Sequence, residues 1–185
     1  RGLGRAHALA FAAEGAKVVV NDLGATLDGQ DVEGTPAQEV VAEIESMGGE
    51  AIVNGDDISD WDGAGALVQS AIDTFGGLDT VVTNAGIVRD RMFVNMTVDE
   101  WDAVIRVHLR GTFCPVKRAV EYWRAESKAD RPRAGRVITT SSGAGLMGSI
   151  AQTNYAAAKA GIAAFTINIA AELGRIGVTA NSIAP

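Results

Sequence analysis

Residues 17–22 read Lys-Val-Val-Val-Asn-Asp, a short β-branched run that ends on two polar side chains. An alanine-rich stretch with helical spacing, residues 2–14, precedes this run, and Gly15 separates the two. Because the run is continuously apolar rather than alternating, it indicates a strand that is buried on both faces. A helix joined to such a strand is typical of a parallel sheet covered by helices.

The same pattern recurs along the rest of the chain. We predict further strands at residues 51–53, 78–83, 136–140 and 178–184, and helices at residues 37–47, 62–75, 98–128 and 151–173. The long helix is expected to kink at Gly111 and Pro115, and residues 23–36 are predicted to form a Gly/Asp-rich loop. Alternating helices and buried strands predict one α/β domain over residues 1–185, a doubly wound parallel sheet in three layers.

Composition excludes several classes of protein. The 185 residues are 47% hydrophobic and 21% charged, which excludes a disordered or collagen-like chain. A net charge of -7 argues against a nucleic-acid or anionic-membrane binder, and no apolar run approaches the ~20 residues of a membrane span. The single cysteine cannot form an internal disulfide or a cysteine-rich metal site. We therefore expect no metal, a reducing setting and a cytoplasmic location.

Neither end of the chain reads as a natural terminus. The sequence opens at Arg1 without methionine and stops at Pro185, directly after a strand-like run. We expect a domain truncated at both ends, whose first strand precedes Arg1. In the strand order 3-2-1-4-5-6 that strand would lie between the runs at 17–20 and 78–83. Unpaired backbone groups cost about 1–3 kcal/mol each, so we expect residues 1–185 alone to be unstable and unable to bind NAD.

The first candidate site is a dinucleotide site. Gly2-x-Gly4 opens a helix, where missing side chains let a pyrophosphate approach the helix N-terminus. Asp22 ends a strand about 20 residues later, where the dinucleotide fold places its ribose-binding acid; alternatively, Asp22 only caps the loop that follows. A carboxylate there repels a 2′-phosphate and Leu23 adds no positive charge, although NADP-using proteins often carry a basic residue where Arg1 stands. NAD is favoured over NADP.

The second candidate site is a proton-transfer pair. Tyr155 and Lys159 are four residues apart on a predicted helix, so both side chains lie on one face. A nearby ammonium stabilises a phenolate and makes the phenol useful for proton transfer near neutral pH. Ser142 follows the preceding strand, and its hydroxyl is placed to bind a substrate oxygen while Tyr155 moves the proton.

Together these motifs resemble the short-chain dehydrogenase/reductase family in order and spacing. The resemblance rests on Gly2-Leu3-Gly4, Asn84-Ala85-Gly86, Ser142, Tyr155-x-x-x-Lys159 and Asn181-Ser-Ile-Ala-Pro185. It implies a Rossmann-like sheet and hydride transfer between NAD(P) and a carbinol or carbonyl carbon. By this resemblance Tyr155 is the general acid/base, Ser142 orients the substrate oxygen, and Lys159 assists Tyr155 and binds the nicotinamide ribose. The implied cofactor-binding residues are Gly2, Leu3, Gly4, Asp22, Asp57, Ile58, Asn84, Ala85, Gly86, Tyr155, Lys159 and Pro185, with Asp57 near the adenine.

One position departs from the family pattern. His108, in Val-His-Leu-Arg-Gly, stands where the family usually has an asparagine that holds water for a proton relay. An imidazole could carry such a relay, so His108 is a fourth catalytic candidate; the alternative is a buried histidine satisfied by backbone groups.

Three segments together resemble one subgroup of the family: residues 107–111 around His108, residues 19–24 with the long loop after them, and residues 86–91. This subgroup is the 3-hydroxyacyl-CoA dehydrogenase domain of peroxisomal multifunctional enzyme type 2, together with bacterial acyl-CoA and steroid side-chain dehydrogenases. The resemblance implies an NAD-dependent dehydrogenase of a secondary alcohol, with 3-hydroxyacyl-CoA as the expected substrate class. The alternatives are a 3-oxoacyl-thioester reductase and a non-catalytic dinucleotide-binding module. We also expect a homodimer or homotetramer assembled through helices 98–128 and 151–173, which are apolar on more than one face.

Overall fold

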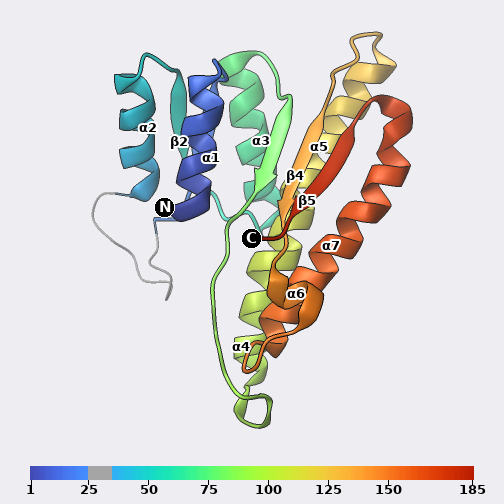
Figure 1. Cartoon of the computed structure of the whole chain (residues 1–185). Helices are drawn as coiled ribbons and strands as arrows, with labels where there is room; N and C mark the ends of the chain where they lie inside the picture. Colours follow the sequence, from blue (N-terminus) through green and yellow to red (C-terminus); the bar gives the residue numbers. More distant parts are fainter. Residues whose placement is uncertain (25–34) are drawn as a thin grey trace.

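The computed structural model describes residues 1–24 and 35–185, so most of the predicted loop at 23–36 lies outside the described residues (Figure 1). In the described part, helices and strands alternate as the sequence predicts. The elements are α1 (Gly2–Ala13), β1 (Val18–Asn21), α2 (Pro36–Ser46), β2 (Ala51–Asn54), α3 (Trp61–Phe75), β3 (Thr80–Thr83), η1 (Phe93–Asn95), α4 (Val98–Ile105), η2 (Arg106–Arg110), α5 (Gly111–Lys128), β4 (Arg136–Thr140), α6 (Gly143–Met147), α7 (Thr153–Leu173), η3 (Gly174–Ile176) and β5 (Thr179–Ile183).

Every strand pair in the described part is parallel, which confirms the predicted sheet type. β1 pairs with β2, in the register Val18 to Ala51. β4 lies between β3 and β5, with Val137 opposite Val81 on one side and Ala180 on the other. The strands therefore form two groups, β1-β2 and β3-β4-β5.

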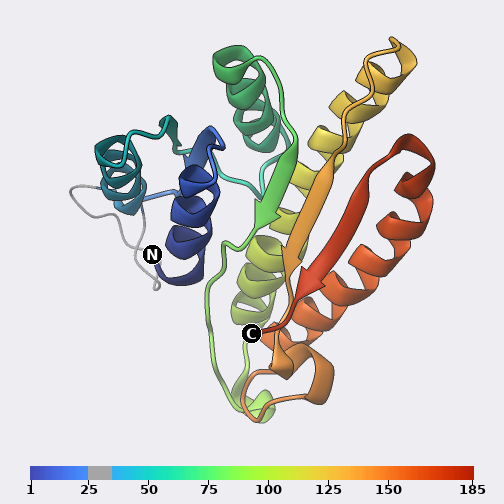
Figure 2. The ribbon, with the colours of Figure 1, turned by 45° about the horizontal axis from the view of Figure 1, so that its top comes forward.

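The two groups of strands have separate hydrophobic cores. α1 and α2 pack on β1 and β2 around Ile44, which is fully buried. α5 and α7 pack on β3, β4 and β5 around Trp123, whose indole Nε1 donates a hydrogen bond of 2.6 Å to the carbonyl of Leu78. Figure 2 shows β3 separated from the α1–α2 group. The division falls between β1 and β3, the position at which the sequence analysis expected a further strand.

Three helices begin at caps that the local sequence supplies. The Thr35 hydroxyl accepts from the backbone of Gln38, whose side chain binds back to Thr35, a capping box at the start of α2. Thr97 and Glu100 form the same arrangement at α4. The carboxylate of Asp60 caps α3 by accepting two backbone N–H groups. Each cap satisfies amide groups that the helix itself leaves unpaired.

The prediction of one long helix over residues 98–128 is wrong in one respect. The helix is interrupted by η2, a π-helical turn over Arg106–Arg110, and α5 then runs on through Pro115. The π-helical turn ends directly before Gly111, one of the two positions at which a kink was expected. A π-helical turn adds a residue to the helical repeat and redirects the side chains it carries.

Three features around α7 also differ from the sequence analysis. The short helix α6 was not predicted, and α7 begins at Thr153 rather than at residue 151. By length and composition alone, the helix from Thr153 to Ile176 could cross a membrane, contrary to the expectation that no segment qualifies. We retain the interpretation of a helix that covers the sheet with one face, because α7 packs on β4, β5 and α6 and carries the buried polar residues Asn154, Lys159 and Thr166.

Candidate active site

The candidate residues gather at the edge of the sheet where its strands end. Because all the pairs are parallel, the carboxyl ends of neighbouring strands lie at the same edge, where α/β folds bind ligands. Both chain ends and α6 lie at this lower edge in Figure 1. The residues that follow the strands there are Asp22, Asp57, Asn84, Ser141, Ser142 and Pro185.

Lys159 is the buried centre of this edge. Its side chain is 3% exposed, and its Nζ donates a hydrogen bond of 2.7 Å to the carbonyl of Thr140 at the end of β4. Burial lowers the pKa of Lys159 to about 8. Nζ lies 5.5 Å from the centroid of the Tyr155 ring. The structure therefore brings the predicted pair together, and at neutral pH the ammonium lies beside the phenol.

Ser142 is held next to this pair by α6. Its backbone is extended, and its Oγ accepts from the N–H of Ala144, which makes Ser142 the N-cap of α6. Gly145 lets α6 approach α7 closely, since a Cβ at this position would come 2.7 Å from the Cβ of Lys159. The neighbouring Ser141 donates a hydrogen bond of 2.8 Å to the carbonyl of Lys159. A capping Ser142 still has its own hydroxyl proton to donate to a substrate oxygen.

His108 lies on the other side of Tyr155 and is 3% exposed. The two rings meet edge to face, with centroids 5.1 Å apart and planes at 88°. His108 Nε2 is 2.7 Å from the carbonyl oxygen of Ile87 and 3.2 Å from its amide nitrogen. We assign the proton to Nε2, which then donates along the shorter contact. Nδ1 is buried and has no hydrogen-bond partner among the described residues.

The imidazole is kept neutral by its surroundings. Burial lowers the pKa of His108 to about 4, and the nearby positive charge of Lys159 acts in the same direction, against the bond to Ile87. Gly86 is required beside it, because a Cβ there would overlap His108 Cε1. The contact to Ile87 agrees with the interpretation of a buried histidine satisfied by a backbone group, and the relay stays a prediction.

The start of α1 has the features of a phosphate-binding site. No side chain caps the helix, and its first turn contains no acidic residue, so its N–H groups face no carboxylate of their own turn. Gly4 lies against Asn84 at the end of β3, since a Cβ on Gly4 would be 3.1 Å from the Asn84 Nδ2. The same edge of the sheet therefore carries the residues Gly2, Leu3 and Gly4 and the segment Asn84–Gly86. This is so although α1 packs on the β1–β2 group and β3 belongs to the other group of strands.

Asp22 follows β1 at the same edge. Its N–H donates to the carbonyl of Asn54 over 3.1 Å, which continues the pairing of β1 with β2. One of its carboxylate oxygens accepts the N–H of Gly24 over 2.8 Å, so Asp22 does cap the start of the loop. A carboxylate has two oxygens, and capping through one is compatible with binding a ribose hydroxyl through the other.

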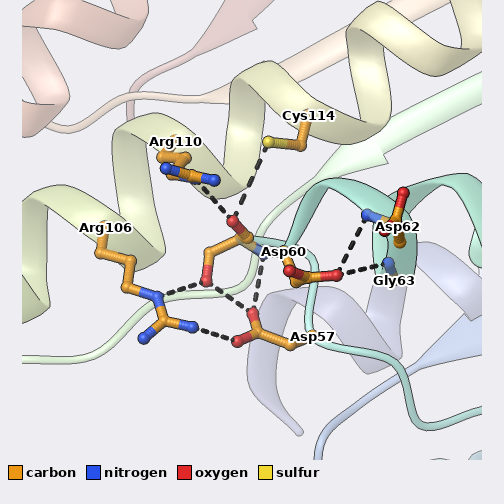
Figure 3. Close-up of polar contacts among 8 residues, drawn as sticks. Asp57, Asp60, Asp62, Gly63, Arg106, Arg110 and Cys114 are labelled. Carbon is orange, nitrogen blue, oxygen red and sulfur yellow. Dashed lines mark hydrogen bonds and ion pairs between the residues drawn. The ribbon is translucent and has the colours of Figure 1, made fainter.

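Asp57, expected near the adenine, lies in a turn with two arginine neighbours (Figure 3). Its Oδ1 accepts from the N–H and the hydroxyl of Ser59, and its Oδ2 accepts from Arg106 over 2.7 Å. Burial raises the pKa of Asp57, but the hydrogen bonds from Ser59 and the Arg106 charge outweigh it and hold the pKa below its usual range. Arg110 donates to the Ser59 carbonyl. Sequence reasoning missed both arginines, although their i, i+4 spacing was visible.

Comparison with known proteins settles the family. The profile of the short chain dehydrogenase family matches residues 1–185. The chain belongs to this family. It is 50% identical over its whole length to "Hydroxyacyl-CoA dehydrogenase ChsB1" of Mycobacterium tuberculosis and covers 57% of that protein. It is 43% identical to "Peroxisomal multifunctional enzyme type 2" of Mus musculus, covering 24% of it. A crystal structure of a short chain dehydrogenase from Mycobacterium avium superposes with a TM-score of 0.94 at 60% identity; all of this chain and 66% of that chain are covered.

These comparisons confirm the predicted family, subgroup resemblance and fold, and the chain spans a little over half the length of its curated mycobacterial relative. Membership in the short-chain dehydrogenase family implies a nicotinamide dinucleotide cofactor. The uncapped N-terminus of α1 and the acid at Asp22 fit such a group. Within residues 1–24 and 35–185, no cluster of three or more His, Cys, Asp or Glu side chains could hold a metal ion.

The lowered pKa of His108 makes a prediction about stability. In the unfolded chain His108 takes up a proton as the pH falls through about 6.5, whereas the folded protein resists protonation down to about 4. Protonation therefore favours unfolding in this window, and His108 should remove about 2 kcal/mol of stability between pH 7 and pH 5. The measurement is urea unfolding at both pH values for the protein and for His108→Asn. The same loss of stability in both would contradict the assignment.

Proposed function

We propose that this protein is an NAD-dependent oxidoreductase that transfers a hydride between the carbinol carbon of a 3-hydroxyacyl-CoA and the nicotinamide. The observation that carries the proposal is the buried Lys159 ammonium beside Tyr155, at the edge that also holds Ser142 and the start of α1. The names of the two curated relatives support the substrate class. The activity is proposed for the intact protein that contains residues 1–185.

The chemistry divides between the cofactor and this chain. A bound nicotinamide would supply the acceptor for the hydride that leaves the carbinol carbon. The hydroxyl proton of the alcohol passes to the oxygen of Tyr155, while Ser142 donates a hydrogen bond to the same substrate oxygen as it becomes a carbonyl. Lys159 stabilises the negative charge on Tyr155 before it takes up this proton. In the reverse direction Tyr155 returns the proton as the carbonyl is reduced.

His108 has a supporting part in this scheme. Its ring lies against the Tyr155 ring, and its neutral Nδ1 is buried with no hydrogen-bond partner among the described residues. Such an atom is suited to accept a hydrogen bond from water, so His108 can take the place of the family asparagine in a relay without becoming charged. Its pKa of about 4 argues against a role as general acid at neutral pH.

Replacing Tyr155 by phenylalanine tests the proton-transfer step. The change removes one hydroxyl and keeps the ring that packs on His108, so folding and NAD binding should be retained. We expect kcat with NAD and a 3-hydroxyacyl-CoA to fall at least ~100-fold, as is typical when a general acid/base is removed. Initial rates and NAD titration measure the two effects. A variant that keeps more than a tenth of the kcat would refute the role of Tyr155.

The choice of NAD is part of the proposal and rests on Asp22. A carboxylate at the end of β1 repels the 2′-phosphate of NADP, and the adjacent Leu23 offers it no cation. We expect Asp22→Ala to weaken the preference for NAD, and Asp22→Ala combined with Leu23→Arg to reverse it. The ratio of kcat/KM for the two cofactors is the readout. An unchanged ratio in the double variant would show that Asp22 does not set the choice.

The same residues would also catalyse the reverse reaction, reduction of a 3-oxoacyl thioester. Asp22 argues against that direction, because reductive biosynthesis usually draws on NADPH. Initial rates in both directions, over acyl-CoA chains of increasing length, identify the preferred reaction and acyl group. A protein that binds NAD but turns over no alcohol or ketone would instead be a non-catalytic module. A cytoplasmic location remains part of the proposal.

We also propose a homodimer or homotetramer built on α5 and α7. α7 is apolar over most of its length, yet only 22% of its most apolar window is buried. Ile167 on α7 is 73% exposed and Phe113 on α5 is 44% exposed. One face of each helix covers the sheet, so the other face is available to a second copy.

A charge on the exposed face of α7 tests the assembly. We expect Ile167→Glu to reduce the mass measured by light scattering at micromolar concentration, because an interface would bury the carboxylate. The control is Met47→Glu at the end of α2, where Met47 is 53% exposed. A protein that is monomeric before any substitution, or an Ile167→Glu variant with unchanged mass, would contradict this interface.

A further inference from the structure

The π-helical turn η2 sends its side chains in two directions. Arg106 donates from Nε to the hydroxyl of Ser59 over 2.9 Å, and from Nη2 to the carboxylate of Asp57 over 2.7 Å (Figure 3). Arg110 donates from Nε to the backbone carbonyl of Ser59 over 2.7 Å. His108, between them in sequence, reaches the opposite way, to Ile87 and Tyr155. One turn of helix therefore contacts two separate parts of the edge.

Both arginines donate hydrogen bonds to Ser59. It is 2% exposed, and its hydroxyl donates to Asp57 while it accepts from Arg106. The turn also packs against the start of α5, because Ile58 lies against Gly111. A Cβ on Gly111 would come 3.0 Å from the Cδ1 of Ile58. A buried polar side chain with all its bonds formed fixes local geometry, since any other arrangement leaves groups unpaired.

The position of the Asp57–Ser59 turn indicates which end of the cofactor would bind near it. A pyrophosphate at the start of α1 and a ribose at Asp22 define the direction of a bound dinucleotide. β2 pairs with β1 in register, and Figure 1 shows β2 on the opposite side of the molecule from α7, the helix that carries Tyr155; Asp57 follows the end of β2. This is the side on which the adenine must lie if the nicotinamide is to reach Tyr155.

We propose that Arg106, assisted by Arg110, is a positioning residue that fixes the Asp57–Ser59 turn for the adenine end of the cofactor. The inference rests on the proposed use of NAD and adds residues that the family motifs do not include. Arg106 holds the carboxylate of Asp57 in one orientation, and Arg110 holds the backbone of Ser59. Because η2 also holds His108, a single turn sets the geometry at both ends of the dinucleotide.

Arg106→Met is the decisive variant, because methionine keeps the apolar stem and loses the guanidinium. We expect the inhibition constant of 5′-AMP, which carries only the adenine end of the cofactor, to rise about fivefold, and the KM for NAD to rise with it. The kcat at saturating NAD should stay within about twofold, since Arg106 lies away from Tyr155. Arg106→Lys, which reaches Asp57 but has no fork for Ser59, should give an intermediate inhibition constant.

The matched control is Arg131→Met. Arg131 also forms an exposed guanidinium–carboxylate pair of 2.7 Å, with Glu126 at the end of α5, far from the turn in sequence. Its loss should leave AMP inhibition unchanged. An inhibition constant for Arg106→Met equal to that of the control, or a fall in kcat without a change in AMP inhibition, would overturn the proposal. If Arg106→Met does not fold, AMP inhibition of Arg106→Lys at the level of the unaltered protein overturns it.

The same experiment separates this inference from the proposed function. An unaltered protein on which neither 5′-AMP nor NAD acts would refute the proposed use of NAD. An unaltered protein that binds both, together with an Arg106→Met variant that binds AMP equally well, would refute only the role of Arg106.

Discussion

The hydrogen bond from Lys159 Nζ to the carbonyl of Thr140 joins α7 to the end of β4, and the rest of the site is arranged around it. Burying an ammonium is costly unless its protons form hydrogen bonds, and the carbonyl at the end of β4 accepts one of them. Tyr155 lies one helical turn earlier, Ser141 binds the carbonyl of Lys159, and α6 approaches the same residue through Gly145. The fold thus supplies a buried charge beside a phenol.

A second constraint is the division of the strands into two groups. The residues proposed to bind the phosphates and adenosine lie mainly in the group of β1 and β2, whereas Ser142, Tyr155 and Lys159 lie in the group of β3, β4 and β5. Gly4 and Asn84 meet where these groups approach each other. A dinucleotide bound along this edge would contact both groups, so its binding energy would also stabilise their relative placement.

Much of the fold was predictable from short-range pattern. Continuous β-branched runs identified the strands, because a strand buried on both faces has no polar positions to alternate with. Tyr155, Lys159 and Ser142 were predictable from spacing and strand position, and the structure brings Lys159 to Tyr155 as expected. Their catalytic roles, and those of the cofactor-binding residues, stay predictions.

Other features depended on contacts between distant segments and left little trace in the sequence. The turn at Arg106–Arg110 is π-helical and not a kink, and its bonds to Asp57 and Ser59 cross about fifty positions of the chain. α6 is five residues long, too short for any periodicity to indicate it. The close approach of Gly86 to His108 explains the glycine only once both positions are known in space.

The central claim is that this edge of the sheet moves a hydride from an alcohol carbon to a nicotinamide. Its most direct test uses a 3-hydroxyacyl-CoA with deuterium on the carbinol carbon, incubated with NAD and the protein, followed by mass spectrometry of the reduced cofactor. The account predicts one deuterium in each molecule of NADH formed, together with a slower turnover than with the unlabelled substrate. NADH without deuterium, or 3-oxoacyl-CoA formed without any reduced cofactor, would contradict it.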